Sequence, residues 1–333
     1  MYESYRTVGR GLLQGATRRF AERGFMASSR PADLKPRVDI IGVPFDLGAS
    51  RRGSRFGPAA LRAARLLPQL ESLGYDVRDA GDIAVPESDT EEDGDAQSPL
   101  HADLVCNACL LTADAVERSL KAGAFPVVIG GDHSLAIGAL AGVARVKGPQ
   151  GIVWIDAHAD MNTPLTSPTG NLHGMAMAGA LGDIRDVFPP AQFPAPSVEP
   201  GRCVFVGLRD LDPGEKRALR ERGMSCFTMS DIDRMGMAKV MERAVEIAGR
   251  GPGSLHVSFD IDALDPTTAP GTGTPVAGGL TYREAHLAME MAAESGVAHS
   301  IELVEVNPTL DDGATTATVG VALLCSALGK SIL

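Results

Sequence analysis

The segment Gly151-Ile-Val-Trp-Ile-Asp-Ala-His-Ala-Asp160 passes from five apolar or small residues to an alternation of ionisable residues with alanine. A short apolar run of this kind is typical of a strand buried on both faces of a parallel sheet. In extended backbone, alternate side chains point to the same side, so Asp156, His158 and Asp160 would face one site. The segment therefore predicts a parallel sheet with a polar site where one strand ends.

The same arrangement of an apolar run, a loop and a helix-like stretch recurs along the chain. Further strands are predicted at 38–43, 125–129, 203–206, 255–259 and 301–304, with weaker candidates near 76–77 and 226–227. Helix-like segments lie between them at 59–73, 113–122, 215–222, 237–250 and 282–295. This alternation predicts an α/β fold, a single-domain three-layer α-β-α sandwich with a mostly parallel central sheet.

We assign residues 37–333 to this single domain and residues 1–36 to an N-terminal extension. The extension is rich in arginine, which faintly suggests a transit peptide, but Glu3 and Glu22 count against that interpretation. Met26 could also be an alternative start. We therefore expect a poorly ordered extension rather than a targeting signal.

Ionisable residues follow five of the predicted strands. His133 follows 125–129, Asp156 follows 151–155, Asp212 follows 203–206, Asp260 follows 255–259 and Glu305 follows 301–304. In an open parallel sheet, binding sites form outside the carboxyl ends of the strands. We therefore expect these side chains to meet at one edge of the sheet.

The residue types at this edge point to metal ions. Taken alone, each short motif is more often a helix cap or an ordinary polar residue than a ligand set. Together they place four carboxylates near two imidazoles, and so many carboxylates cannot all stay ionised in one small site without cations. The predicted ligands of a dinuclear centre are His133, Asp156, His158, Asp160, Asp260 and Asp262. This mixture favours Mn²⁺, with Co²⁺, Ni²⁺, Fe²⁺ or Zn²⁺ as alternatives, and a metal pair lowers the pKa of a shared water.

Composition narrows the class of partner. The chain has 333 residues, a formal net charge of -11 and a pI of about 5.1. This charge argues against nucleic acid as a partner and fits a small cationic substrate weakly. No apolar run is long enough to span a bilayer. The five cysteines suggest no disulfide framework, so reduced thiols in a cytoplasmic protein fit best.

At this point the motifs resemble those of the ureohydrolases and, within them, the arginases. The resemblance runs from about Ile40 to about Leu328. The matching stretches are Gly130–Gly138, Asp156–Asp160, Ser258–Pro266, Gly273–Pro275, Gly278–Glu284 and Glu305–Pro308. The resemblance implies an arginase-like catalytic domain with two Mn²⁺ per subunit, assembled as a homotrimer or homohexamer.

The loop from Asp160 to Gly174 resembles the arginase loop that reads the amino-acid end of arginine. The resemblance implies that Asn162, Thr169 and Asn171 bind the α-carboxylate. Asp212 would bind the α-ammonium group, with Glu215 assisting through water, and Thr274 would make a further substrate contact. Arginases usually carry serine at the position of Thr169. The stretch Met175–Ala178 is also more apolar than expected beside a pocket mouth.

The resemblance also implies a reaction, hydrolysis of the guanidinium group of L-arginine to L-ornithine and urea. Asp160 would ligate a metal and accept a proton from the nucleophile. Glu305 would pair with the guanidinium nitrogens, and His173 would carry a proton to the leaving amine. The nearest alternative is an agmatinase, a guanidinobutyrase or another guanidino hydrolase. A metal-dependent deacetylase and a non-catalytic binding protein are alternatives of other classes.

Overall fold

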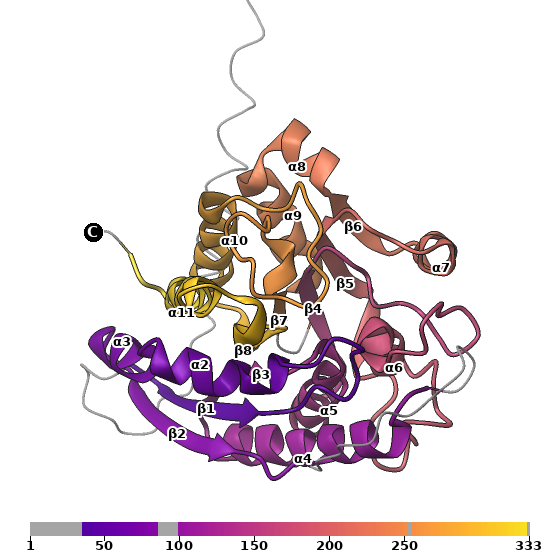
Figure 1. Ribbon diagram of the computed structural model, residues 1–333, viewed down its shortest axis with the longest axis horizontal. Helices are drawn as coiled ribbons and strands as arrows, with labels where there is room; N and C mark the ends of the chain where they lie inside the picture. The colour runs from indigo at the N-terminus through magenta and orange to yellow at the C-terminus, as the bar shows by residue number, and fades with distance from the viewer. Residues whose placement is uncertain (1–34, 86–98, 252–254, 332–333) are drawn as a thin grey trace, which may run out of the picture. The chain divides into compact units, whose positions relative to one another are not determined.

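The computed structural model describes residues 35–85, 99–251 and 255–331. Most of the predicted N-terminal extension therefore lies outside the described residues. These residues form an eight-stranded sheet in the order β2-β1-β3-β8-β7-β4-β5-β6, and every pairing in it is parallel (Figure 1). The strands are β1 (Arg37–Val43), β2 (Asp76–Asp82), β3 (Phe125–Gly130), β4 (Gln150–Ile155), β5 (Val198–Leu208), β6 (Ser225–Thr228), β7 (Leu255–Asp260) and β8 (Ala298–Val304). All the predicted strands, including the two weaker candidates, are confirmed.

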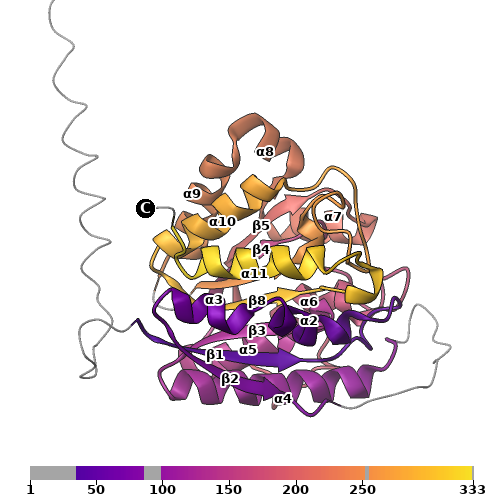
Figure 2. The ribbon, with the colours of Figure 1, turned by 60° about the vertical axis from the view of Figure 1, so that its left-hand side comes forward.

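Helices cover both faces of this sheet (Figure 2). One face packs against α2 (Gly57–Ala63), α3 (Leu66–Ser72), α8 (Met229–Met235), α9 (Met237–Ala248), α10 (Tyr282–Glu294) and α11 (Thr315–Ala327). The other packs against α4 (Ala102–Lys121), α5 (Ala136–Lys147), α6 (Ala176–Leu181) and α7 (Pro213–Arg222). The predicted three-layer α/β fold is confirmed, with a sheet that is parallel throughout rather than mostly. None of the helices described is long and apolar enough to cross a membrane.

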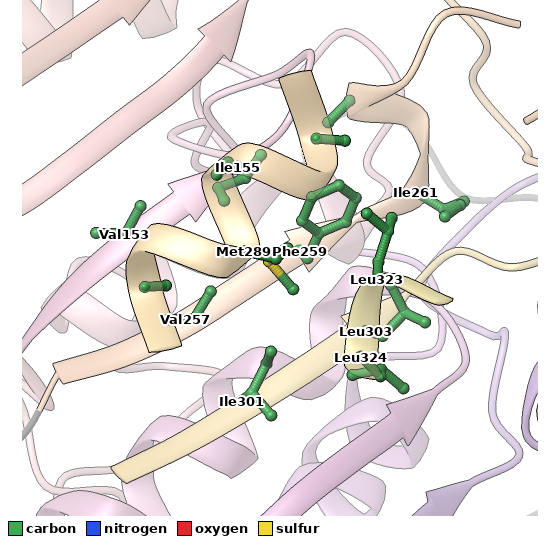
Figure 3. Close-up of a cluster of buried hydrophobic side chains, with 14 of the residues drawn as sticks. Val153, Ile155, Val257, Phe259, Ile261, Met289, Ile301, Leu303, Leu323 and Leu324 are labelled. Atoms are coloured by element: carbon green, nitrogen blue, oxygen red, sulfur yellow. The ribbon is translucent and has the colours of Figure 1, made fainter. Parts of the chain in front are cut away.

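The face under α10 and α11 carries an apolar core (Figure 3). Val257 and Phe259 on β7 alternate with polar residues and so point to the same side of the sheet. Both are buried there with Leu303 of β8, Met289 of α10 and helix α11. This packing holds β7 and β8 in place, and their carboxyl ends carry several of the predicted site residues.

The other face brings α5 unusually close to α4. A Cβ atom added at Gly138 would lie 2.2 Å from the carbonyl oxygen of Cys109, and one at Gly142 would lie 2.5 Å from that of Ala113. Nearly all of α5 is buried, so its sequence of alanine, glycine and large aliphatic residues lacks a polar stripe. A helix without that stripe gives no amphipathic period, and α5 is absent from the helices predicted above for this reason.

The predicted helix at 59–73 is in fact two helices. The chain turns at Arg65, whose φ of 69° is left-handed, and α3 begins at Leu66. Pro68 therefore lies in the first turn of α3, where its missing N–H and fixed φ are tolerated. The prediction of a single continuous helix was therefore wrong, and Pro68 is the residue in the sequence that indicates the start of a second helix.

Candidate metal centre

The predicted metal ligands lie at the carboxyl ends of three strands, β3, β4 and β7. Strands β4 and β7 are neighbours, and β8 lies between β7 and β3. His133 begins the short 3-10 turn after β3, Asp156 directly follows β4, and Asp260 is the last residue of β7. Because β3, β8, β7 and β4 run parallel and side by side, their ends meet at one edge (Figure 1). The structure thus brings the ligand types to one place, as expected.

Two groups of side chains at this edge have metal-binding geometry, and they share Asp156. One group consists of His133, Asp156 and Asp160, and the other of Asp156, His158 and Asp262. In the first group, Nδ1 of His133 lies 3.1 Å from Asp156 Oδ2 and 3.2 Å from Asp160 Oδ2. In the second, Nδ1 of His158 lies 3.4 Å from Asp156 Oδ1 and 3.1 Å from Asp262 Oδ2. Each oxygen of Asp156 therefore faces a different histidine.

Asp260 is the sixth predicted ligand, and its Oδ2 lies 3.2 Å from Nδ1 of His133. It thus joins the first group, while its other oxygen accepts a hydrogen bond from the backbone N–H of Asp262. Burial, together with the negative charges of Asp262 and Asp156, holds the pKa of Asp260 well above its ordinary value. The same causes, burial first and then the charge of Asp156, raise the pKa of Asp160 and of Asp262.

The atoms of this cluster fit a divalent cation. Nδ1 of His133 is buried and makes no hydrogen bond within the described chain, yet three carboxylate oxygens lie 3.1–3.2 Å from it. Without a metal, burial would lower the pKa of His133, but the carboxylates of Asp156, Asp160 and Asp260 outweigh burial and raise that pKa strongly. A divalent cation would neutralise the same oxygens and leave the imidazole neutral, the form in which histidine binds metals.

Two residues of the centre have left-handed backbone, which is rare outside glycine. Asp160 has a φ of 51° and Glu305 a φ of 62°. Hydrogen bonds hold both conformations: the carbonyl oxygen of Asp160 accepts from the N–H groups of Met177 and Ala178, and the N–H of Glu305 donates to Gly131. Strained backbone of this kind clusters at functional sites, where neighbouring structure supports it.

The sequence interpretation missed residues that orient the ligands. Trp154 stacks on the His133 ring at a centroid distance of 4.0 Å, and its Nε1 donates to Asp156 Oδ2 at 3.0 Å. Ser258 Oγ lies 2.7 Å from Nε2 of His133. A signal was available, because Trp154 and Ser258 each precede a ligand aspartate by two residues and so share its side of the strand.

Arg209 also supports the centre, although no role was predicted for it. Its guanidinium donates to the carbonyl oxygens of Asp262 at 2.6 Å and Val276 at 2.8 Å, and to those of Ala263 and Leu264. Desolvation lowers the pKa of Arg209 despite the carboxylates nearby. Arg209 therefore fastens the loop after β7, which carries Asp262, to the loop around Val276.

The two predicted proton-handling residues touch each other. Nδ1 of His173 lies 3.0 Å from Oε1 of Glu305, and the same oxygen accepts the backbone N–H of His133 at 2.9 Å. Burial would lower the pKa of His173, but the hydrogen bond and the charge of Glu305 outweigh burial and raise it to about 9. In this structure the His173 imidazole is therefore protonated at neutral pH.

The predicted substrate residues form two contacting pairs. Nδ2 of Asn162 donates to Oδ2 of Asp212 at 2.8 Å, which joins the loop after Asp160 to the start of α7. The exposed Thr169 accepts the backbone N–H of Asn171 through its hydroxyl oxygen. The side chain of Asn171 in turn accepts a hydrogen bond from Ser50 at 2.8 Å.

The remaining two substrate candidates have structural partners. Glu215 is buried, and its oxygens accept the backbone N–H groups of Met161 at 3.1 Å and Asp212 at 2.8 Å. Burial and the charge of Asp160 raise the pKa of Glu215 to about 7. Thr274 donates its hydroxyl proton to Oδ2 of Asp262 at 2.9 Å. Both contacts orient neighbouring predicted site residues.

Comparison with known proteins agrees with this geometry. The model of the arginase family matches residues 36–329. The arginase of Bacillus caldovelox is 46% identical over 301 residues, which cover 90% of this chain and 100% of that protein. Human mitochondrial arginase-2 is 42% identical over 313 residues, which cover 88% of this chain and 85% of that protein.

Solved structures show the same relationship. The native structure of the Bacillus caldovelox arginase superposes with a TM-score of 0.86 and covers 90% of this chain and 100% of its own. A hypothetical agmatinase from Burkholderia thailandensis superposes with a TM-score of 0.67 at 27% identity, covering 89% of this chain and 85% of its own. The family match, together with the α/β fold and a paired carboxylate–imidazole cluster that could hold metal ions, identifies the class as the ureohydrolases. Within that class, the chain belongs to the arginase family.

Proposed function

We propose that this enzyme hydrolyses L-arginine to L-ornithine and urea with two Mn²⁺ ions per subunit. The observation that carries the proposal is that Asp156 belongs to both metal-binding groups, with one oxygen toward each histidine. A carboxylate shared in this way suits two adjacent cations rather than one. Carboxylate-rich ligands with two imidazoles and no thiolate favour Mn²⁺.

The chain supplies a complete ligand set for such a pair. His133, Asp160 and Asp260 would hold one ion, His158 and Asp262 the other, and Asp156 both. When bound, a metal pair makes hydroxide available at neutral pH. The 3-10 turns at His133 and Ile261 and the left-handed Asp160 fix the ligand directions before any ion binds.

Glu305 and His173 would act on the guanidinium group. Of the two carboxylate oxygens of Glu305, only Oε1 makes hydrogen bonds within the described residues, so Oε2 is available to a guanidinium N–H. That contact would orient the planar carbon toward the ligand cluster. The Glu305 carboxylate, 3.0 Å from Nδ1 of His173, favours the protonated imidazole, and His173 is partly exposed, so it can donate a proton to the leaving amine of ornithine.

Arginine is the proposed substrate because the loop after Asp160 offers groups that match an amino-acid end. Asn162, Thr169 and Asn171 offer amide and hydroxyl groups for a carboxylate, and the Asp212 carboxylate can accept from an ammonium. Agmatine lacks the carboxylate, so the first three residues would have no partner on it. Glu215 would act by fastening Asp212 and Met161, and Thr274 by orienting Asp262.

The test is urea release from a guanidino panel, with matched variants. L-Arginine, agmatine and 4-guanidinobutyrate are each supplied to the wild type and to Asn171→Ala, with and without Mn²⁺, and bound metal is counted. We expect two metals per chain, cleavage of arginine, and a higher KM for arginine in the variant. Cleavage of agmatine but not arginine would refute the substrate assignment, and one metal per chain would refute the dinuclear centre.

We further propose that the enzyme assembles as a homotrimer or homohexamer, as the family resemblance implies. We also propose that it is cytoplasmic, where its five cysteines would stay reduced. The acidic charge of -11 leaves nucleic acid a poor partner. Light scattering on the eluted protein distinguishes three subunits of 34.8 kDa from six. A monomer that is fully active would contradict the proposed assembly.

A further inference from the structure

The two central strands β7 and β8 carry polar side chains on the face that packs against α4 and α5. Strands buried on both faces of a parallel sheet are ordinarily apolar throughout. Here His256 and Ser258 of β7 lie in register with Ser300 and Glu302 of β8, and all four residues are buried. Polar groups at such positions are costly unless their hydrogen bonds serve a purpose.

These side chains form a continuous row that ends at a metal ligand. Nε2 of His133 lies 2.7 Å from Ser258 Oγ, and that oxygen lies 2.7 Å from Oε1 of Glu302. Oε1 of Glu302 lies 3.5 Å from Nε2 of His256. Nδ1 of His256 in turn lies 2.8 Å from Ser300 Oγ. The row connects the centre of the sheet to the edge where His133 lies.

The hydrogen bond between Ser258 and Glu302 sets the direction of the next one in the row. Ser258 Oγ donates its one proton to Oε1 of Glu302 at 2.7 Å. Ser258 can then only accept from His133, whose Nε2 must carry the proton. The lone pair of His133 is thereby left on Nδ1, toward Asp156, Asp160 and Asp260.

We propose that Glu302, whose Oε1 lies 3.5 Å from Nε2 of His256, is a positioning residue that fixes the metal-binding tautomer of His133 through Ser258. Partners of this kind on the far nitrogen of a histidine ligand raise its basicity and hold the ring in place. The role rests on the proposed metal centre but not on arginine being the substrate. It explains why a carboxylate with one oxygen lacking any hydrogen bond in the described chain is kept in the middle of the sheet.

The decisive variant is Glu302→Gln, which keeps the size of the side chain. An amide can donate to Ser258, and Ser258 would then donate to Nε2 of His133 and move the ring proton to Nδ1. The variant therefore disfavours the ligand form without removing the ligand. Ser258→Ala breaks the row at its middle and serves as a second test should the glutamine variant fold poorly.

Ser326→Ala is the matched control. Ser326 is also buried and its Oγ lies 2.8 Å from Nδ1 of a histidine, His286, but this pair bridges α10 and α11 rather than reaching the metal ligands. A loss of metal binding caused only by removing a buried serine–histidine hydrogen bond would appear in this variant as well.

The experiment titrates the EDTA-treated full-length enzyme with Mn²⁺ and follows free Mn²⁺ by electron paramagnetic resonance. In Glu302→Gln and Ser258→Ala we expect one of the two ions to bind about 10- to 100-fold more weakly, while the other is little changed. Weakening of one ion alone is a result that a general loss of structure would not give. Ser326→Ala should match the wild type.

Three outcomes would overturn the proposal. Unchanged affinity for both ions in the two variants would show that Glu302 has no influence on His133. Equal weakening of both ions, or equal weakening in Ser326→Ala, would indicate a general loss of structure. A wild-type enzyme that binds no second ion would refute the dinuclear centre itself, which the other two outcomes leave intact.

Discussion

Substitution of Asp260 by asparagine should stabilise the metal-free protein and weaken the stabilisation by Mn²⁺. Asp260 lies among like charges that, together with burial, raise its pKa, so its negative form is unfavourable without a cation. In Asp260→Asn, Oδ1 can still accept the N–H of Asp262, as the carboxylate does at 2.8 Å. The neutral amide would remove one of the negative charges that crowd this buried cluster, where Oδ2 of Asp260 lies 3.2 Å from Nδ1 of His133.

The size of each effect follows from these contacts. Each unit by which burial and neighbouring charges raise the pKa of a carboxyl group costs about 1.4 kcal/mol of stability where the unfolded chain is ionised, and a neutral amide avoids this cost. The metal-free variant should therefore be more stable than the wild type by at least about 1 kcal/mol. With Mn²⁺ at about 1,000 times its dissociation constant, each site of the wild type gains about 4 kcal/mol. A variant that loses one carboxylate from the His133 group should lose much of the gain from that site.

The assay is urea unfolding of both proteins, in EDTA and in saturating MnCl₂. We expect the order of the unfolding midpoints to reverse between the two conditions. Asp265→Asn is the control, because Asp265 hydrogen-bonds Thr267, Gly278 and Gly279 rather than the cluster. If Asp260→Asn is the less stable protein in EDTA and keeps the full Mn²⁺ gain, the account of carboxylate repulsion is wrong.

Three further predictions concern packing, pH and thiol chemistry. Gly138→Ala should lower the free energy of unfolding in urea by about 1–3 kcal/mol, because the new Cβ would clash with the carbonyl oxygen of Cys109. Gly201→Ala is the control and should leave that free energy nearly unchanged, since no atom lies within 4 Å of its Cβ position. Hydrogen bonds from Thr267 lower the pKa of Asp265 from 3.8 to about 2, so the stability that the ionised carboxylate contributes is present above about pH 4 and lost toward pH 2. The stability advantage of the wild type over Asp265→Asn in EDTA should therefore shrink between about pH 4 and about pH 2. An advantage that stays constant over this range would contradict the prediction. Burial raises the pKa of the Cys226 thiol to about 11, so a disulfide reagent at pH 8 should label it slowly in the native enzyme; labelling as fast as in urea would count against this burial.

Much of the centre was predictable because its ligands follow strands with a regular period. The apolar run before Asp156 indicates the fold class, and the alternation Asp156-Ala-His-Ala-Asp160 indicates three of the six predicted ligands. Six of the eight strands were recognisable for the same reason, since each is a short apolar run before a polar loop, whereas the edge strand β2 is polar and largely exposed. Charge repulsion then made metal ions the economical explanation of the cluster.

What the sequence could not predict depends on contacts between distant segments. The spacing of Trp154 and Ser258 from the aspartates shows only which side of the strand they share, and their contacts with His133 depend on how the strands are ordered in the sheet. The left-handed backbone at Glu305 has no local signal, because glycine is the residue that normally marks it. The buried helix α5 was missed because packing, rather than an amphipathic period, decides it, whereas the break at Arg65 was missed although Pro68 signals it.

The strand order has a consequence for how the enzyme is made. Strand β8 comes last in the sequence but lies between β3 and β7 in the sheet, so it alone joins the β2-β1-β3 half to the β7-β4-β5-β6 half. On the ribosome, His133 would emerge long before the strand that brings it beside Asp260. We therefore expect completion of the metal centre to be a late step of biogenesis, and a chain stalled before residue 298 to lack His133 beside the ligands that follow β4 and β7.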